Sequence, residues 1–282
     1  MKLKKSGAEI FIPDGVSVEE ALIRTTHMAI AAHQDDIEIM AMDGILKAFG
    51  TSDQWFTGVV VTNGSGSPRD ALYAQYTDEQ MQQIRKIEQK KAAYVGEYGA
   101  QVLLDYPSSE VKDRQNQVLV DELQELITLA KPNVIYTHNL ADKHDTHIAV
   151  TVKVITALRQ LSPAQRPEKI YGCEVWRDLD WMPDQEKVVF DVSAHENIAA
   201  ALLGVFDSQI CGGKRYDLAT MGRRKAHATF SASHGVDTAT GFTYAMDLTP
   251  LITNEKLDIV EFITEEIAKF SLDVEQRVKR FV

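Results

Sequence analysis

The chain has 282 residues and a mass of 31.5 kDa, which is enough to bury a substantial core in one large α/β domain or two small ones. Its 30 lysine and arginine residues against 41 aspartate and glutamate residues give a net charge of −11, which argues against nucleic acid or an anionic membrane surface as the main partner. No apolar stretch reaches the length of a membrane span or of a signal-peptide core, so we expect a cytoplasmic protein. The two cysteines, Cys173 and Cys211, stand far apart without metal-type pairing and are expected to be reduced.

Short apolar runs alternate with segments of helical spacing along the chain. After an expected edge strand and short helix over residues 8–26, strands are predicted at 28–32, 56–62, 102–107, 132–139, 169–176 and 187–192. Helices are predicted at 35–49, 78–99, 118–130, 146–158, 194–210, 216–231 and 261–282, with a polar loop over 231–246. This alternation predicts an α/β fold with a mostly parallel sheet.

No repeat, low-complexity tract or disordered linker interrupts the chain. We therefore expect a single domain over residues 1–282. Its core, over about 25–160, carries the motifs described next, and about 165–282 completes the sheet and the substrate pocket.

The first group of polar residues directly follows the strand predicted at 28–32. His33, Asp35 and Asp36 stand between this strand and the next helix, at the edge where open α/β sheets place their sites. His33 and Asp36 are three residues apart across a turn, so both can point at one divalent ion. Asp35 projects in a different direction, and we expect it to remain free as a base.

A second polar group follows the strand predicted at 132–139. His144 and His147 lie three residues apart at the start of a predicted helix and therefore share a face. Imidazole nitrogen and carboxylate oxygen are ligands of Zn²⁺, and a catalytic zinc site keeps one position open for water. One of the two histidines can complete a metal site with the first group while the other faces substrate.

Four further residues are candidates for substrate binding, and two of them have a plainer alternative. Arg69 ends a glycine-rich loop and could meet a substrate anion or be a solvated surface arginine. Trp176 lies near acidic residues, which is common in sugar sites but also fits a packing tryptophan. Asp142 precedes the second group, and His234, in the late polar loop, could approach the pocket.

The two polar groups resemble the motifs of a known family. Residues 32–38, Ala-His-Gln-Asp-Asp-Ile-Glu, resemble the A-H-P-D-D-x-E signature of the LmbE/PIG-L-like zinc N-deacetylases. His144-x-x-His147 resembles the family's second, H-P-D-H-type motif, and the similarity extends to residues 62–66. The resemblance covers about the first 160 residues.

Some positions near the motifs depart from the family or extend the likeness. Gln34 stands where the family usually has proline, which removes a fixed φ but no chemical group. In the second motif Asp145 follows the first histidine, and Thr146 takes the place of the usual aspartate. Arg85 and Glu88 share the family pattern on a predicted helix, where they either pair on the surface or organise the wall of the site.

The resemblance implies a Rossmann-like three-layer α/β/α fold and a zinc-dependent deacetylase. His33, Asp36 and His147 would be the zinc ligands, Asp35 the general base and His144 the residue that stabilises the oxyanion. The implied reaction removes an N-acetyl group from a small amino-sugar substrate of the N-acetylglucosamine type. Family members are often homo-oligomers, so we expect one here.

Two other functions remain open from the residues. A different metallohydrolase, such as a phosphoesterase or amidase, could use the same ligands, although few additional carboxylates are grouped for a second ion. A sugar-binding protein without turnover is the other alternative. Binding alone needs neither a free base at Asp35 nor His144.

Overall fold

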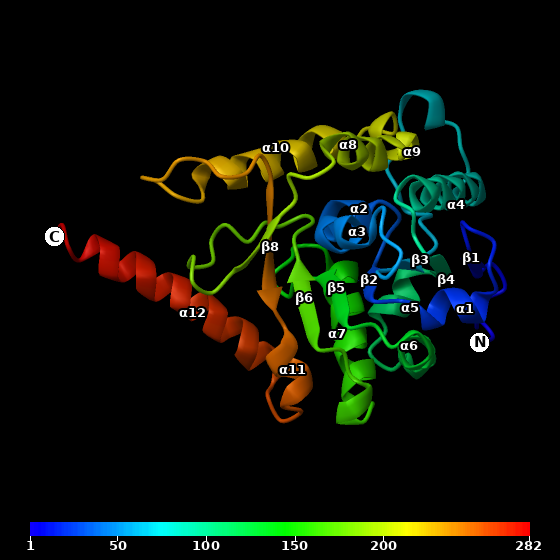
Figure 1. The fold of residues 1–282 in the computed structure, drawn as a ribbon, viewed down its shortest axis with the longest axis horizontal. Helices are drawn as coiled ribbons and strands as arrows, with labels where there is room; N and C mark the ends of the chain where they lie inside the picture. The colour runs from blue at the N-terminus through cyan, green and yellow to red at the C-terminus, as the bar shows by residue number, and fades with distance from the viewer.

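A computed structural model describes all 282 residues, and one eight-stranded sheet runs through its centre (Figure 1). The strands are β1 (Glu9–Phe11), β2 (His27–Ala31), β3 (Phe56–Thr62), β4 (Ala100–Tyr106), β5 (Val134–His138), β6 (Lys169–Cys173), β7 (Val188–Asp191) and β8 (Phe242–Asp247). Their order is β1-β4-β3-β2-β5-β6-β8-β7. Strands β2 to β6 pair in parallel, whereas β1, β7 and β8 pair antiparallel at the two sides. The predicted α/β fold with a mostly parallel sheet is confirmed.

Helices cover both faces of the sheet and make the fold three-layered (Figure 1). One layer contains α2 (Asp36–Met40), α3 (Met42–Ala48), α4 (Asp78–Val95), α8 (Glu196–Gly204), α9 (Asp207–Ile210) and α10 (Tyr216–Phe230). The other contains α1 (Val18–Ile23), α5 (Ser108–Lys112), α6 (Gln117–Ala130), α7 (Asp145–Arg159), α11 (Thr249–Thr253) and α12 (Ile259–Val278). Two short 3-10 helices, η1 (Ala71–Tyr73) and η2 (Pro163–Gln165), complete the elements.

Strand β2 is buried on both faces, as its continuous apolar sequence predicts. Because successive side chains of a strand point to opposite faces, Met28 and Ile30 join one core while Ala29 and Ala31 join the other. The sheet therefore separates two apolar cores. One lies under α1, α6 and α7, and the other lies under α2, α3 and α8.

The order of the strands reverses beside β2. The chain passes from β2 to β3 and β4 on one side, and then returns to place β5 on the other side of β2. In open α/β sheets, this reversal leaves a crevice at the carboxyl ends of the two strands, where ligands bind. Both polar motifs follow these two strands, so the topology brings them together.

Several element predictions were wrong in detail. The helix predicted over 35–49 is divided at Ala41, whose φ of −110° and ψ of 25° are not helical. The segment at 242–246 is strand β8 and not loop, because pairing with β6 and β7 outweighs its polar surroundings. The short helices α5 and α11 were not predicted, since five residues carry too little periodicity.

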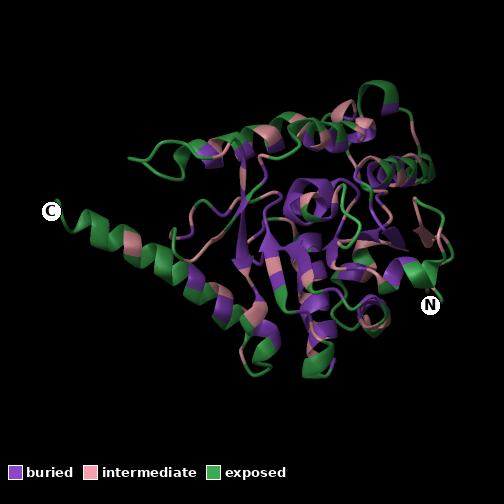
Figure 2. Cartoon of the chain, in the orientation of Figure 1, coloured by how far each residue is buried: buried purple, intermediate pink, exposed green.

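Helix α12 differs from the others in how little of it is covered. Its first half packs on the body through Phe262 and Glu266, but no residue beyond Glu266 is buried (Figure 2). The second half extends from the body toward the C-terminus (Figure 1). None of the helices combines the length and the apolar character needed to cross a bilayer.

Candidate active site

The loop between β2 and α2 holds the first motif in a fixed shape. Asp35 has a left-handed backbone, with φ of 91° and ψ of −29°, which is uncommon for a residue other than glycine. Its backbone N–H donates to the side-chain oxygen of Gln89 on α4 at 3.3 Å. The backbone N–H of His33 donates to Oδ2 of Asp36 at 2.7 Å. These contacts hold a turn in which consecutive carboxylates point in different directions.

The second motif is organised by the buried carboxylate of Asp142. One oxygen accepts the backbone N–H groups of Lys143 at 2.6 Å and His144 at 3.2 Å. The other lies 3.2 Å from Nδ1 of His147 and accepts the backbone N–H of Trp176 at 3.2 Å. A carboxylate behind an imidazole fixes its tautomer and ring orientation, so Nε2 of His147 is directed into the site.

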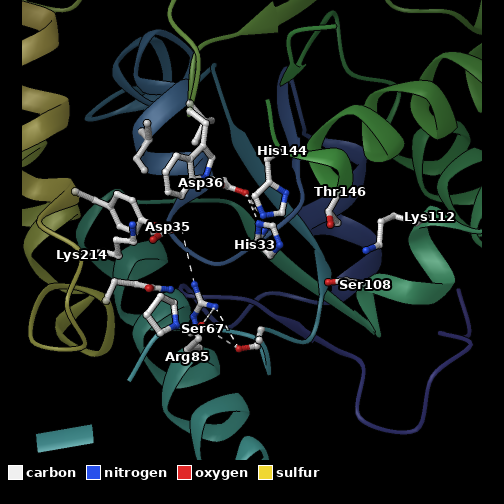
Figure 3. Close-up of a pocket in the computed structure, with 18 residues that line it drawn as sticks. His33, Asp35, Asp36, Ser67, Arg85, Ser108, Lys112, His144, Thr146 and Lys214 are labelled. Carbon is white, nitrogen blue, oxygen red and sulfur yellow. Dashed lines mark hydrogen bonds and ion pairs between the residues drawn. The ribbon is translucent and has the colours of Figure 1, made fainter. Parts of the chain in front are cut away.

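Three ligand-type atoms from the two motifs converge between the strands, and Figure 3 shows two of the residues that supply them, His33 and Asp36. Nδ1 of His33 lies 3.2 Å from Oδ2 of Asp36 and 3.2 Å from Nε2 of His147. Nε2 of His147 lies 3.3 Å from the same Asp36 oxygen. With zinc at its usual distance from nitrogen and oxygen, the edge of a coordination tetrahedron is about 3.3 Å. The triangle of atoms therefore fits a tetrahedral ion with a fourth position left for water.

The protonation states in this triangle are mostly those that a metal needs. Burial lowers the pKa of His33 to about 4, so its imidazole is neutral at pH 7. Burial would raise the pKa of Asp36, but the charge of His147 and the hydrogen bond from His33 hold it well below its usual range. Burial opposes a charge on His147, yet Asp36 and Asp142 raise its pKa, so a proton would leave His147 when an ion binds.

A fourth histidine, His138 at the end of β5, lies behind the triangle. Its Nε2 is 3.6 Å from Oδ2 of Asp36, so His33, Asp36, His138 and His147 are all placed where they could hold a metal ion. The same nitrogen accepts the backbone N–H of Ala32 at 2.9 Å, which occupies its lone pair. Its ring stacks on that of His147 with centroids 3.9 Å apart. The contacts therefore favour a supporting position for His138 over ligation.

The carboxylate of Asp35 stands apart from the triangle. Its Oδ1 lies 4.0 Å from Nη2 of Arg85, and its Oδ2 is buried without a hydrogen-bond partner. Burial and then the charge of Asp36 raise the pKa of Asp35 well above its usual value. A carboxylate beside a cavity, with a free oxygen and a raised pKa, has the properties of a general base.

His144 occupies the cavity side of the triangle. Its ring stacks on His147 with centroids 4.5 Å apart and meets His33 edge to face at 5.0 Å. Burial and then the charge of His147 lower the pKa of His144, and its Nδ1 has no protein partner. Its nitrogens also lie within ligand range of His33 and His147. This geometry fits two roles for His144, as a metal ligand or as a hydrogen-bond donor to a substrate oxygen.

A cavity of about 410 Å³ opens over these groups (Figure 3). Its floor contains the two motifs, and its walls come from segments far apart in the sequence. The wall residues include Gly64, Ser67, Arg85, Ser108, Lys112, Thr146, Trp176, Gln209, Lys214 and Tyr216. The cavity is therefore completed by the C-terminal part of the chain, and not by the first 160 residues alone.

The structure brings most of the predicted site residues together but leaves three outside the cavity. His33, Asp35, Asp36, His144 and His147 converge, and Trp176 lines the wall. Arg69 is paired with Asp78 and donates to the carbonyl of Ser65, so it does not line the cavity. His234 lies exposed in the loop after α10. Asp142 lies behind His147 and contacts this histidine, and it does not line the cavity.

Arg85 was expected either to pair with Glu88 on the surface or to organise the wall of the site, and the structure shows it in the wall. Arg85 is only 3% exposed and donates to the carbonyl of Gln34 at 2.8 Å, inside the wall. Glu88 instead accepts the backbone N–H of Ser208 on α9 at 2.7 Å. The surface pair is corrected because helix α9 covers this face of α4, which no local pattern shows. The signal that indicated the wall position of Arg85 was its place in the family pattern.

Solved structures share this fold at low sequence identity. The 4-carboxy-2-hydroxymuconate hydratase GalB of Pseudomonas putida is 15% identical with a TM-score of 0.60, over 79% of this chain and 95% of its own. N,N'-diacetylchitobiose deacetylase from Pyrococcus horikoshii is 14% identical with a TM-score of 0.58, over 78% and 83%. Teicoplanin deacetylase, solved in a zinc-inhibited form, is 14% identical with a TM-score of 0.55, over 79% and 98%. At these identities the likeness establishes the fold.

The sequence itself matches a family model between the first core strand and helix α7. No curated protein matches the chain by sequence. The model of the GlcNAc-PI de-N-acetylase family, PIG-L, matches residues 28–158, a span that contains both motifs and all the converging histidines. This match confirms, over residues 28–158, the resemblance to the PIG-L (LmbE-like) de-N-acetylases that the two motifs indicated.

Proposed function

We propose that this protein is a metal-dependent N-deacetylase that hydrolyses the acetamido group of an amino sugar. The observation that carries the proposal is the triangle of His33, Asp36 and His147 with the free carboxylate of Asp35 beside it. The PIG-L family match and the deacetylases among the structural neighbours support the same reaction.

His33, Asp36 and His147 would hold zinc or another divalent first-row ion. When bound, such an ion supplies an acidified water and polarises the amide carbonyl. Asp35 would accept the proton of the attacking water and then deliver it to the leaving nitrogen, because an amine leaves only once it is protonated. His144 would donate to the carbonyl oxygen as negative charge develops there, and one such donor is typically worth about 3 kcal/mol.

A second reaction has one specific observation in its favour, since the same fold occurs in a hydratase. Addition of water to a carbon–carbon double bond could also use a base at the position of Asp35. Fold likeness alone is weak evidence for chemistry, and the family match favours the amide. A phosphoesterase with two ions is less well supported, because Asp35 and Asp36 are the only carboxylates that line the cavity.

The test is release of acetate and free amine from a panel of N-acetylglucosamine derivatives. The purified protein is assayed as prepared, after chelation, and after restoring one equivalent of zinc, because the teicoplanin deacetylase has a zinc-inhibited form. Chelator-sensitive release that returns with the metal is the expected result. If the zinc-bound protein released no acetate from any compound of the panel but hydrated an unsaturated acid, the proposed function would change from deacetylase to hydratase.

A further inference from the structure

The cavity carries positive charge that the proposed reaction does not use. Lys112 on α5 and Lys214 before α10 line it from opposite sides, with His33 and His144 between them (Figure 3). Neither ammonium group forms an ion pair within the protein. Lysines elsewhere in the chain do pair with carboxylates, as Lys86 does with Asp105 at 2.8 Å.

The acidic groups in the cavity do not balance these lysines. Asp35 and Asp36 are the only carboxylates in the lining. Asp35 already has Arg85 at 4.0 Å, and Asp36 faces the imidazoles of the triangle. The two ammonium groups therefore remain uncompensated at the mouth of a largely polar site.

The two lysines have different surroundings. Lys214 places its Nζ 5.0 Å from the ring centroid of Trp176, so an aromatic face accommodates its charge. Lys112 has no such ring, and beside it lie Ser108, one turn earlier on α5, and Thr146 from α7 (Figure 3). Thr146 is only 2% exposed, and neither its hydroxyl nor that of Ser108 has a hydrogen-bond partner in the protein.

One ammonium and two free hydroxyls supply several donors directed to one place. Carboxylate and phosphate oxygens accept hydrogen bonds from such donors, and bonds to a charged partner are shorter and stronger than neutral ones. We propose that the substrate carries a carboxylate or phosphate group that is bound by Lys112, Ser108 and Thr146. The proposal rests on the proposed deacetylase function and narrows its substrate class to acidic amino-sugar derivatives.

The test compares kcat/KM for N-acetylglucosamine with that for two phosphorylated forms, the 1- and 6-phosphates, and for a carboxylated form, N-acetylmuramic acid. We expect an acidic sugar to exceed the neutral one by about tenfold or more, mainly through KM. Lys112→Met should remove that preference, so that kcat/KM for the acidic sugars falls to the value for the neutral one, whereas Thr146→Val should weaken it. Lys91→Met, the same change on the exposed face of α4, is the matched control.

Binding measured by calorimetry separates this proposal from the proposed reaction. If acidic sugars bound to the wild type but not to Lys112→Met, and no sugar were turned over, the anion site would be supported and the deacetylase function contradicted. Turnover with equal KM and equal affinity for acidic and neutral sugars would overturn the anion site and leave the deacetylase standing. A preference for phosphate over carboxylate, or the reverse, would identify which anion the donors fit.

A second and independent observation concerns α12. Beyond Glu266 this helix has no buried residue, although isolated helices of such length are marginal in water. Its exposed apolar residues include Val260, Ile267 and Val274, at 67%, 48% and 42% exposure, and Phe281 lies just beyond the end of the helix at Val278. They repeat every seven residues, which is the spacing by which one helix packs along another.

The charges of α12 indicate the direction of the partner helix. Residues 259–270 contain three glutamates and one lysine, which gives 1 − 3 = −2. Residues 271–282 contain two acidic and three basic residues, which gives 3 − 2 = +1. An antiparallel copy of the same helix would place each acidic half against a basic half. We infer that α12 pairs antiparallel with α12 of a second copy of this chain.

The test is the mass of the full chain in solution by light scattering and sedimentation. We expect an assembly that the pair of changes Ile267→Glu and Val274→Glu dissociates. Leu272→Glu, on the opposite face and 52% exposed, is the control and should leave the assembly intact. Circular dichroism checks that each variant is folded. A monomeric wild type, or an assembly that the double variant does not change, would overturn the pairing.

Discussion

Replacing Asp142 by asparagine tests whether the metal site depends on a residue behind it. The two carboxylate oxygens face four donors, which are the backbone N–H groups of Lys143, His144 and Trp176 and the Nδ1–H of His147. Asparagine has one oxygen, so its NH₂ group must face two of these donors. If the oxygen stays with Lys143 and His144, His147 loses a charged hydrogen bond worth about 1.5–3 kcal/mol. Metal affinity should then fall about 10- to 100-fold.

The assay is competition for zinc against a chromophoric chelator, with urea unfolding of the zinc-free protein beside it. If the amide turns the other way, the turn into α7 is lost instead, and the free energy of unfolding should drop by about 1–3 kcal/mol. Asp145→Asn, the same change at an exposed position three residues later, is the control. Wild-type zinc affinity together with wild-type stability in Asp142→Asn would refute the assignment of this carboxylate to His147.

Three further predictions address the base, a ligand and the packing of the core. Asp35→Asn should bind zinc normally but lose about 10²- to 10⁴-fold in kcat, and normal activity would place the base elsewhere. His147→Ala should contain less than one zinc per chain by atomic absorption, and unchanged content would remove it as a ligand. Gly58→Ala should destabilise the protein by about 1–3 kcal/mol in urea, since a Cβ there would lie 2.5 Å from Oε1 of Gln101. Gly222→Ala, exposed in α10 with nothing within 4 Å, should stabilise it by about 0.5–1 kcal/mol, and a loss at both positions would contradict the packing account.

The parts of the site that lie near strand ends could be predicted from the sequence. The run before His33 is apolar on both faces of β2, and the polar residues start where the strand stops, so their position at the sheet edge follows from local pattern. The contact between His33 and His147 cannot be predicted from local pattern alone, because it depends on β5 pairing with β2 across a long separation in sequence. The family resemblance supplied that information.

The walls of the cavity could not be predicted in the same way. Arg85, Lys112 and Lys214 are charged residues on or beside helices, and nothing local distinguishes a solvated lysine from one that faces a cavity. Their positions depend on how α5, α9 and α10 settle on the sheet. Strand β8 was missed for a related reason, since it is inserted between β6 and β7 by antiparallel pairing that the chain order does not reveal.

The placement of β2 between β3 and β5 also determines when a metal site can exist during folding. Strand β5 begins at Val134, so His33 has no completed partner set until more than a hundred further residues have been synthesised and paired. Joining segments so far apart carries a loop-closure cost and is slow compared with forming a hairpin. Zinc binding should therefore appear in refolding only with the latest kinetic phase, so the ion would act as a lock on the finished fold and not as its nucleus. Zinc uptake in the earliest phase of stopped-flow refolding would show the opposite order.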